Sequence, residues 1–387
     1  MTRRIDIAMQ KKIKIFCPKF SSNDDMVLQI VRPGIINSDM CEFSHASLLD
    51  PQSQLFNEAF RQNIRSGRWV CKIPPEAFKN IRIDIIQDEK HDLNMFLDDV
   101  DVVLLHSSGS EKCYRYIAEQ SKKFFPHAPI INVDYFDTPA DRMHVRLNNM
   151  DQHNVYNFKR SMVDTNNGKI NKFTHHIQHA AFCVREDIYT QQNKMYRPYN
   201  KREYDVACFF PCKTTEGNVN KMLTGEVDTP LHTRGWLASV VKWCQPDAYV
   251  GYTSGVQDTS PQKEGRSGEG LNTPGTTQYN YCDISTNSKI IVTACPTNYE
   301  GDYRLMEAMT SGALVMHNKM FIPPEGLVDG EHWIIYKDAI DLRNKMDYYI
   351  NNTGEAARIA TTGRKFVLEN HRPHHRVEQW LKEAGLL

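Results

Sequence analysis

The 387-residue sequence has no surplus of charge of either sign, because 47 lysines and arginines balance 47 aspartates and glutamates. A neutral chain gives no electrostatic reason to expect nucleic acid or an anionic membrane as the main partner. No stretch reaches the roughly 18 consecutive apolar residues of a membrane span. The basic N-terminus, MTRRIDIAMQKKIKIF, lacks the continuous apolar core of a signal peptide. These absences predict a cytoplasmic protein without a transmembrane segment.

Several motifs are also missing, and each absence argues against a class of site. The ten cysteines include no C-x-x-C pair, which predicts free thiols rather than disulfides or a zinc site. The histidines within residues 175–179 and 371–375 lack cysteine or acid partners at ligand spacing, so no bound metal is expected. No G-x-G-x-x-G follows an expected strand, which argues against a dinucleotide-dependent oxidoreductase.

The chain does contain the alternation of strands and helices that is typical of parallel α/β proteins. Its 387 residues exceed one ordinary core, so two domains are expected. In the first half, VVLLH (Val102–His106) is a continuous apolar run, typical of a strand buried on both faces. A helix over residues 111–125 and a strand over residues 129–134 complete a β-α-β unit. Strands are also expected over residues 12–17 and 81–86.

Residues 141–200 are polar and poorly periodic, and we expect irregular helical and loop structure that leads to an interdomain link near residues 198–201. A second α/β series follows them. Its strands are expected over residues 204–210, 247–252, 289–294, 313–316 and 333–336. Its helices are expected over residues 237–244, 279–288, 302–310, 338–351, 355–368 and 376–384. We therefore expect domains over residues 1–200 and 201–370, with a final helix in residues 371–387 that crosses back to the first. Ligands of two such Rossmann-like domains bind in the cleft between the carboxyl ends of their sheets.

The segment EGDYRLMEAMTSGALVM (residues 300–316) combines a helix start with charged side chains. A helix that begins after a parallel strand directs free N–H groups and a positive dipole end toward the ligand edge. The apolar face of this helix consists of Leu305, Ala308 and Met309. Arg304 and Glu307 are expected to lie off that face, and Gly312 is expected to end the helix in a left-handed conformation. The segment is either an anion site or an ordinary Arg–Glu surface pair.

The same segment resembles the donor-domain motif R-x-x-E-A-x-x-x-G of group 1 GT-B glycosyltransferases, in particular the exostosin-like and spore-maturation-protein (CgeB-like) branch. The resemblance extends from YDVACFF, at residues 204–210, to the C-terminal helix. It implies an α/β GT-B fold, in which two Rossmann-like domains with parallel sheets face a central cleft. The first half of the chain carries no signature of this kind.

The resemblance implies that the C-terminal domain binds a nucleotide-sugar donor. It assigns donor contacts to Arg304 and Glu307, with Gly301 and Tyr303 at the mouth of the helix. Many retaining relatives have seven residues between two glutamates, whereas six separate Glu300 from Glu307. The stereochemistry of transfer is therefore left open.

Negative charge builds on the diphosphate that leaves during glycosyl transfer. Enzymes of the GT-B class meet this charge with a helix dipole and cationic side chains rather than with a fixed metal. Lys213, in the loop after YDVACFF, and Arg234 are candidates for further cations. As an alternative, each is an ordinary surface charge.

The first domain is expected to bind the acceptor and to supply a base in an inverting enzyme. His106 and Asp134 each end an expected strand and are the candidate bases. Asp134 could instead cap a turn. The Asp-x-Asp at residues 99–101 precedes its strand, which is the wrong end for the metal site of a GT-A enzyme.

The sequence therefore predicts a metal-independent hexosyl- or pentosyltransferase that moves a sugar from a nucleotide-sugar donor to a glycan, a glycoprotein or another hydroxyl acceptor. No cofactor and no nucleic-acid partner are expected. The alternatives are a nucleotide-sugar 2-epimerase, which needs no acceptor, and a non-catalytic GT-B-like protein that binds glycans or scaffolds a complex.

Overall fold

The structure is a computed structural model. It describes residues 12–16, 30–43, 100–106, 125–134, 155–159, 177–227, 234–253, 276–295, 303–320 and 322–387. The chain divides into two compact units. Unit 1 comprises Met1–Met162, Ile170–Ala180 and Pro373–Leu387, and unit 2 comprises Val163–Lys169 and Ala181–Arg372.

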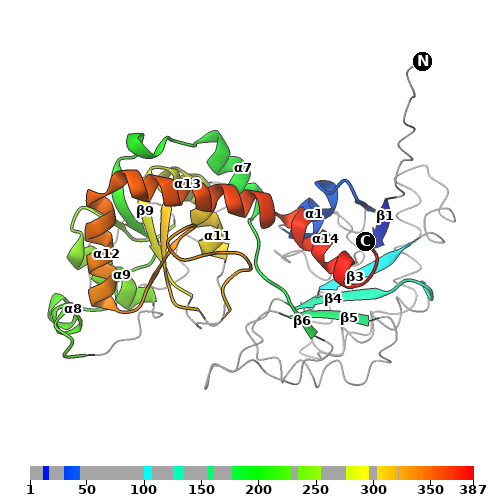
Figure 1. The fold of residues 1–387 in the computed structure, drawn as a ribbon, viewed down its shortest axis with the longest axis horizontal. Helices are drawn as coiled ribbons and strands as arrows, with labels where there is room; N and C mark the ends of the chain where they lie inside the picture. Colours follow the sequence, from blue (N-terminus) through cyan, green and yellow to red (C-terminus); the bar gives the residue numbers. More distant parts are fainter. Residues whose placement is uncertain are drawn as a thin grey trace, which may run out of the picture. The chain divides into compact units, whose positions relative to one another are not determined.

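Unit 1 holds a parallel sheet whose described strands lie in the order β2-β1-β3-β4-β5-β6 (Figure 1). These strands are β1 (Ile13–Phe16), β2 (Cys41–Phe43), β3 (Val102–His106), β4 (Ile130–Asp134), β5 (Val155–Lys159) and β6 (Ile177–His179). The apolar residues of β3 are buried between two neighbouring strands, as its unbroken apolar run predicts. The strand expected over residues 81–86 and nearly all of the helix expected over residues 111–125 lie outside the described residues.

The C-terminal helix α14 (Pro373–Glu383) belongs to unit 1, where it packs against the short helix α1 (Arg32–Ile36). Gly34 permits this close approach. A Cβ at Gly34 would lie 2.6 Å from Cγ2 of Val377 and 2.7 Å from the carbonyl oxygen of Pro373. The last helix of the chain thus completes the core of the unit that contains the first strand.

Unit 2 holds a parallel sheet with the strand order β11-β10-β9-β7-β8. Its strands are β7 (Tyr204–Cys208), β8 (Tyr249–Val250), β9 (Ser288–Thr293), β10 (Leu314–Asn318) and β11 (Ile334–Tyr336). Its helices are α7 (Glu186–Lys194), α8 (Glu216–Leu223), α9 (Arg234–Cys244), α10 (Thr276–Thr286), α11 (Tyr303–Thr310), α12 (Ala339–Asn351) and α13 (Thr353–Asn370).

Helices cover both faces of the unit 2 sheet (Figure 1). In β9, Ile290 and Val292 enter the core formed with α8, α9 and α12, whereas Ile291 enters the core formed with α7, α10 and α11. This alternation follows from the two-residue period of a strand. The α/β class and the parallel sheets expected from the sequence are confirmed.

The segment before unit 2 differs from the sequence-based expectation. Residues 141–200 were expected to hold irregular helical and loop structure, but the strands β5 and β6 lie within them, together with the helix α7. Pairing with β4 forms β5, and pairing with β5 forms β6, without a marked apolar pattern in either strand. Residues 181–200 belong to unit 2 rather than to the first domain, because Val184 and Ile188 are buried in its core beside Leu305.

Two glycines of α13 give a matched test of packing in unit 2. A Cβ at Gly363 would lie 2.1 Å from the backbone oxygen of His332, whereas a Cβ at Gly354 would meet nothing within 4 Å. Gly363→Ala is therefore expected to destabilise the protein by about 1–3 kcal/mol. Gly354→Ala is expected to leave it unchanged or slightly more stable, because alanine favours helix. Urea unfolding measures the stability of both variants. Equal unfolding midpoints for the two variants would contradict the close approach at Gly363.

Candidate functional site

The carboxyl ends of β7, β9 and β10 lie along one edge of the unit 2 sheet, because these strands are parallel. β7 leads into the buried Phe209 and Phe210, and β9 leads into the buried Ala294 and Cys295. Asn318 ends β10, and its Oδ1 accepts a hydrogen bond of 3.0 Å from the N–H of Cys295. The ends of β9 and β10 are thereby tied together at the edge where parallel α/β sheets bind ligands.

Two arginines meet at the ring of Phe210. The guanidinium carbon of Arg234 lies 4.9 Å from the ring centroid, and that of Arg304 lies 5.4 Å from it. Arg234 also donates from Nε to the carbonyl oxygen of Ala294, at 3.3 Å. Cation–π attraction and this hydrogen bond hold both guanidiniums near the carboxyl ends of β7 and β9.

Lys213 joins this group from the loop that follows β7. Its backbone N–H donates to the oxygen of Gly235 at 3.0 Å and to Oγ of Ser239 at 3.1 Å. Its side-chain stem lies against Gly235, where a Cβ would come within 2.6 Å of three of its carbons. The structure therefore brings the three cations expected from the sequence, Lys213, Arg234 and Arg304, to the same edge of unit 2.

Helix α11 begins at Tyr303, whose ring packs edge-on against Phe182 with centroids 4.4 Å apart. The apolar face of α11 is buried as expected, with Leu305, Ala308 and Met309 at most 1% exposed. Gly312 follows the helix with φ of +79°, which is the left-handed conformation expected there. Gly301 lies outside the described residues.

Glu307 lies in the interior of unit 2, with 5% of its surface exposed. Its Oε1 is 3.5 Å from Nε of Arg185, the residue that directly precedes α7. The expectation that Glu307 lies off the buried face is therefore wrong, and the alternative of an ordinary Arg–Glu surface pair is wrong as well. Helical periodicity describes only contacts along one helix, and here α7, which is distant in the sequence, packs on α11.

Burial raises the pKa of the Glu307 carboxyl from 4.5 to about 7. The guanidiniums of Arg185 and Arg304 and a hydrogen bond with Tyr281 act in the opposite direction, while Asp187 adds to the rise. Glu307 is thus a buried acid that changes its charge near neutral pH. No motif in the sequence marked Arg185 or Tyr281 as its neighbours.

Gln192 of α7 is a buried amide that joins three helices. Its Nε2 donates to the backbone oxygen of Glu307 at 2.9 Å and to Oγ of Ser285, on α10, at 3.1 Å. Its Oε1 accepts from Oγ1 of Thr310 at 2.7 Å. These bonds fix the position of α11, and therefore of Glu307, relative to α7 and α10.

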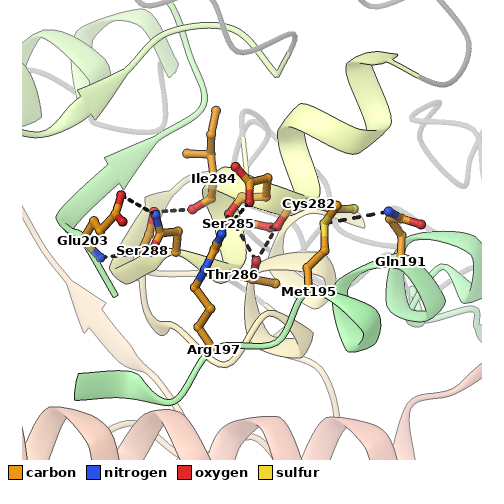
Figure 2. A network of polar contacts seen from close by, with 11 residues as sticks. Gln191, Met195, Arg197, Glu203, Cys282, Ile284, Ser285, Thr286 and Ser288 are labelled. Carbon is orange, nitrogen blue, oxygen red and sulfur yellow. Dashed lines mark hydrogen bonds and ion pairs between the residues drawn. The ribbon is translucent and has the colours of Figure 1, made fainter. Parts of the chain in front are cut away.

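A separate polar network lies at the C-terminal end of α10 (Figure 2). Arg197 extends toward this end of the helix and donates from Nη2 to Oδ1 of Asp283 at 2.9 Å. Asn287 donates to Oε2 of Glu203 at 2.9 Å, and its own Oδ1 accepts from the N–H of Glu203 at 3.0 Å. The chain between α7 and β7 is therefore fastened to α10 by charged and amide groups outside the Glu307 environment.

The candidate bases lie in unit 1. His106 is the last residue of β3 and Asp134 is the last residue of β4, and the register pairs His106 with Val133. The two residues therefore end neighbouring strands at the carboxyl edge of that sheet. In the Asp-x-Asp sequence before β3, Oδ2 of Asp101 accepts a hydrogen bond of 2.8 Å from the N–H of Lys14, so this carboxylate supports β1.

Two features are absent from the residues that the structure describes. No cluster of three or more histidine, cysteine, aspartate or glutamate side chains is arranged to hold a metal ion in these parts of the chain. Among the same residues, no helix has the length and apolar character needed to span a bilayer.

Comparison with known proteins gives a family match over part of the chain. Residues 272–382 match the family described as "Glycosyl transferase-like". HepE from Anabaena, solved with UDP-glucose, is 11% identical, with 97% of this chain and 100% of that chain covered and a TM-score of 0.44. A glycosyltransferase from Rickettsia africae is 12% identical, with coverages of 97% and 98% and a TM-score of 0.47. No curated protein matches the chain in sequence. The family match confirms, for residues 272–382, the resemblance of this part of the chain to glycosyltransferases.

Proposed function

We propose that this protein transfers a sugar from a nucleotide-sugar donor to an acceptor hydroxyl, because residues 272–382 match the family described as "Glycosyl transferase-like". The observation that supports the proposal is the group of cations at the carboxyl edge of unit 2. Arg234 and Arg304 contact Phe210, and Lys213 lies against the start of α9. Such a group, beside the N-terminus of α11, suits the diphosphate of a nucleotide sugar.

In the proposed reaction the acceptor oxygen attacks the anomeric carbon of the donor, and the bond from that carbon to the diphosphate oxygen breaks. Negative charge develops on the departing diphosphate. Arg304, Arg234 and Lys213 stabilise this charge together with the dipole of α11. We propose that these groups suffice without an essential metal ion or other cofactor.

Tyr303 and Gly301 are proposed to border the donor at the start of α11. Glu307 is proposed to accept hydrogen bonds from donor hydroxyl groups in its ionised form, because a carboxylate buried to this degree requires polar partners. Burial raises the pKa of Glu307 to about 7, so the ionised form gains population as the pH rises through neutrality.

Unit 1 is proposed to bind the acceptor, a glycan or a glycoprotein. His106 or Asp134, at the ends of β3 and β4, is proposed to take the proton of the attacking hydroxyl. The transferred sugar is proposed to be a hexose or a pentose. Seven cysteines of the described segments are free thiols, which suits the cytoplasm as the proposed location.

A donor screen tests this function. The purified protein is incubated with each common nucleotide sugar, and its melting temperature and the released nucleotide are measured with and without EDTA. At least one donor is expected to raise the melting temperature, because a ligand that binds only the folded state stabilises it. The same donor is expected to be consumed equally with EDTA present. If no donor shifts the melting temperature or is consumed, the proposal is wrong. Interconversion of the donor sugar without nucleotide release would identify an epimerase.

A further inference from the structure

The environment of Glu307 contains charged groups that the donor motif does not include. From the segment around α7 come Arg185 and Asp187, and from α10 come Tyr281 and Cys282. Arg304 acts on the same carboxyl from α11 itself. The Nε of Arg185, 3.5 Å from Oε1 of Glu307, forms the ion pair that this carboxylate makes within the described segments.

Arg185 is itself held in place. Its Nη2 donates to Oδ2 of Asp187 at 2.9 Å, and its Nε lies 3.3 Å from Oδ1 of the same carboxylate. One guanidinium therefore lies between a partly exposed acid, Asp187, and a buried acid, Glu307. Both Nη2 and Nε face Asp187, and the same Nε lies near Glu307, so Asp187 fixes the guanidinium while its charge acts on Glu307 as an ion pair.

We propose that Arg185 is a positioning residue for donor binding, whose guanidinium, oriented by Asp187, keeps the Glu307 carboxylate ionised and directed toward the donor. The proposal rests on the proposed function of unit 2. It adds a residue that lies far outside the family match at residues 272–382 and that reaches α11 only through the packing of α7.

The charge of Arg185 determines the direction in which its removal shifts the pKa of Glu307. Burial raises the pKa of Glu307, and the charge of Arg185 opposes this rise. Removal of Arg185 is therefore expected to raise the pKa of Glu307 further, so that less carboxylate is ionised at neutral pH. Donor binding that needs the ionised form then requires a higher pH.

The experiment compares Arg185→Gln and Arg185→Lys with the wild type. The dissociation constant and KM of the donor found in the screen are measured from pH 5.5 to pH 9. Arg185→Gln is expected to raise KM about fivefold at pH 7 and to move the acidic limb of the profile upward by about one pH unit, since a nearby opposite charge lowers a carboxyl pKa by about that much. Much of the affinity should return at pH 9, and Arg185→Lys should restore part of it at pH 7.

Arg197→Gln is the matched control. Like Arg185, Arg197 precedes β7 and pairs with an acid, but that acid is Asp283 of α10 rather than Glu307. This variant is expected to show the same pH dependence of donor KM and dissociation constant as the wild type. A loss of donor affinity in Arg185→Gln that is equal at every pH, or no loss of donor affinity, would overturn the proposal.

A second readout does not depend on activity. The pH dependence of the melting temperature reports the ionisation of Glu307 through linkage. In the wild type, stability falls as the pH rises toward the pKa of Glu307. In Arg185→Gln this fall is expected to continue to a higher pH. The same substitution in a Glu307→Gln background is expected to have no such effect. If no donor binds but this coupling is present, the proposed function fails while the contact between Arg185 and Glu307 stands. If the coupling is absent, the proposal for Arg185 fails.

Discussion

Replacement of Arg304 by alanine is expected to lower donor affinity and turnover by about 100-fold, because a charge-assisted contact to the diphosphate is lost. The guanidinium of Arg304 lies over Phe210, at the start of α11 and beside the carboxyl end of β7. It is therefore the cation that joins the helix N-terminus to the proposed phosphate position. Donor titration and steady-state kinetics measure the loss.

The fold is expected to survive this change, since a partly exposed cation–π contact contributes only about 0.5–1 kcal/mol. Arg304→Lys should retain part of the activity, because lysine keeps the charge but loses the planar fork. Arg358→Ala is the surface control, since Arg358 on α13 is exposed and donates only a long hydrogen bond of 3.3 Å to Gly330 among the interactions described for it. Normal turnover in Arg304→Ala would show that the donor site lies elsewhere.

Replacement of Glu307 by glutamine is expected to stabilise the protein at alkaline pH while it abolishes donor binding. Burial raises the pKa of Glu307 from 4.5 to about 7 in the folded protein. Between these values the folded state binds more protons than the unfolded state, so stability falls as the pH rises. The stabilisation that comes from the raised pKa of Glu307 is fully present below pH 4.5 and is lost as the pH rises through about 7.

Above pH 7 the wild type therefore carries a buried charge that costs roughly 3 kcal/mol relative to the neutral acid. Glutamine has the same shape without the charge. Arg185 is left without this partner in the variant, but its side chain is 26% exposed and still faces Asp187. The variant should melt several degrees above the wild type at pH 8, and the two should converge near pH 4.5.

Glu369→Gln is the control for this comparison, because Glu369 pairs with Lys365 on the exposed surface of α13 at 3.9 Å. It is expected to leave the pH dependence of melting unchanged. A Glu307→Gln variant that melts below the wild type at pH 8 would contradict the analysis, since it would mean that the nearby guanidiniums outweigh burial. A stable variant that still binds donor normally would remove Glu307 from the site.

The local features of unit 2 could be predicted from the sequence. The apolar run KIIVTA, the spacing of Leu305, Ala308 and Met309, and the position of Gly312 predicted a strand, a helix face and a helix end that the structure contains. These features depend on contacts between residues that are close in the sequence. The spacing of apolar residues along a strand or a helix indicates which of them share a face, so such contacts can be predicted. The strand Val102–His106 was predicted to its exact bounds for the same reason.

The contacts between these parts depend on how distant segments of the chain pack. Arg234 and Arg304 are distant in the sequence, and their contact with Phe210 depends on strands β7 and β9 lying side by side. Glu307 was assigned to a free helix face, but α7 covers it, and burial changes its acid strength. The side chains that the motif contains could be read from the sequence alone. Packing between distant segments determined which of them are exposed and which are buried, because burial depends on neighbours that no local pattern encodes.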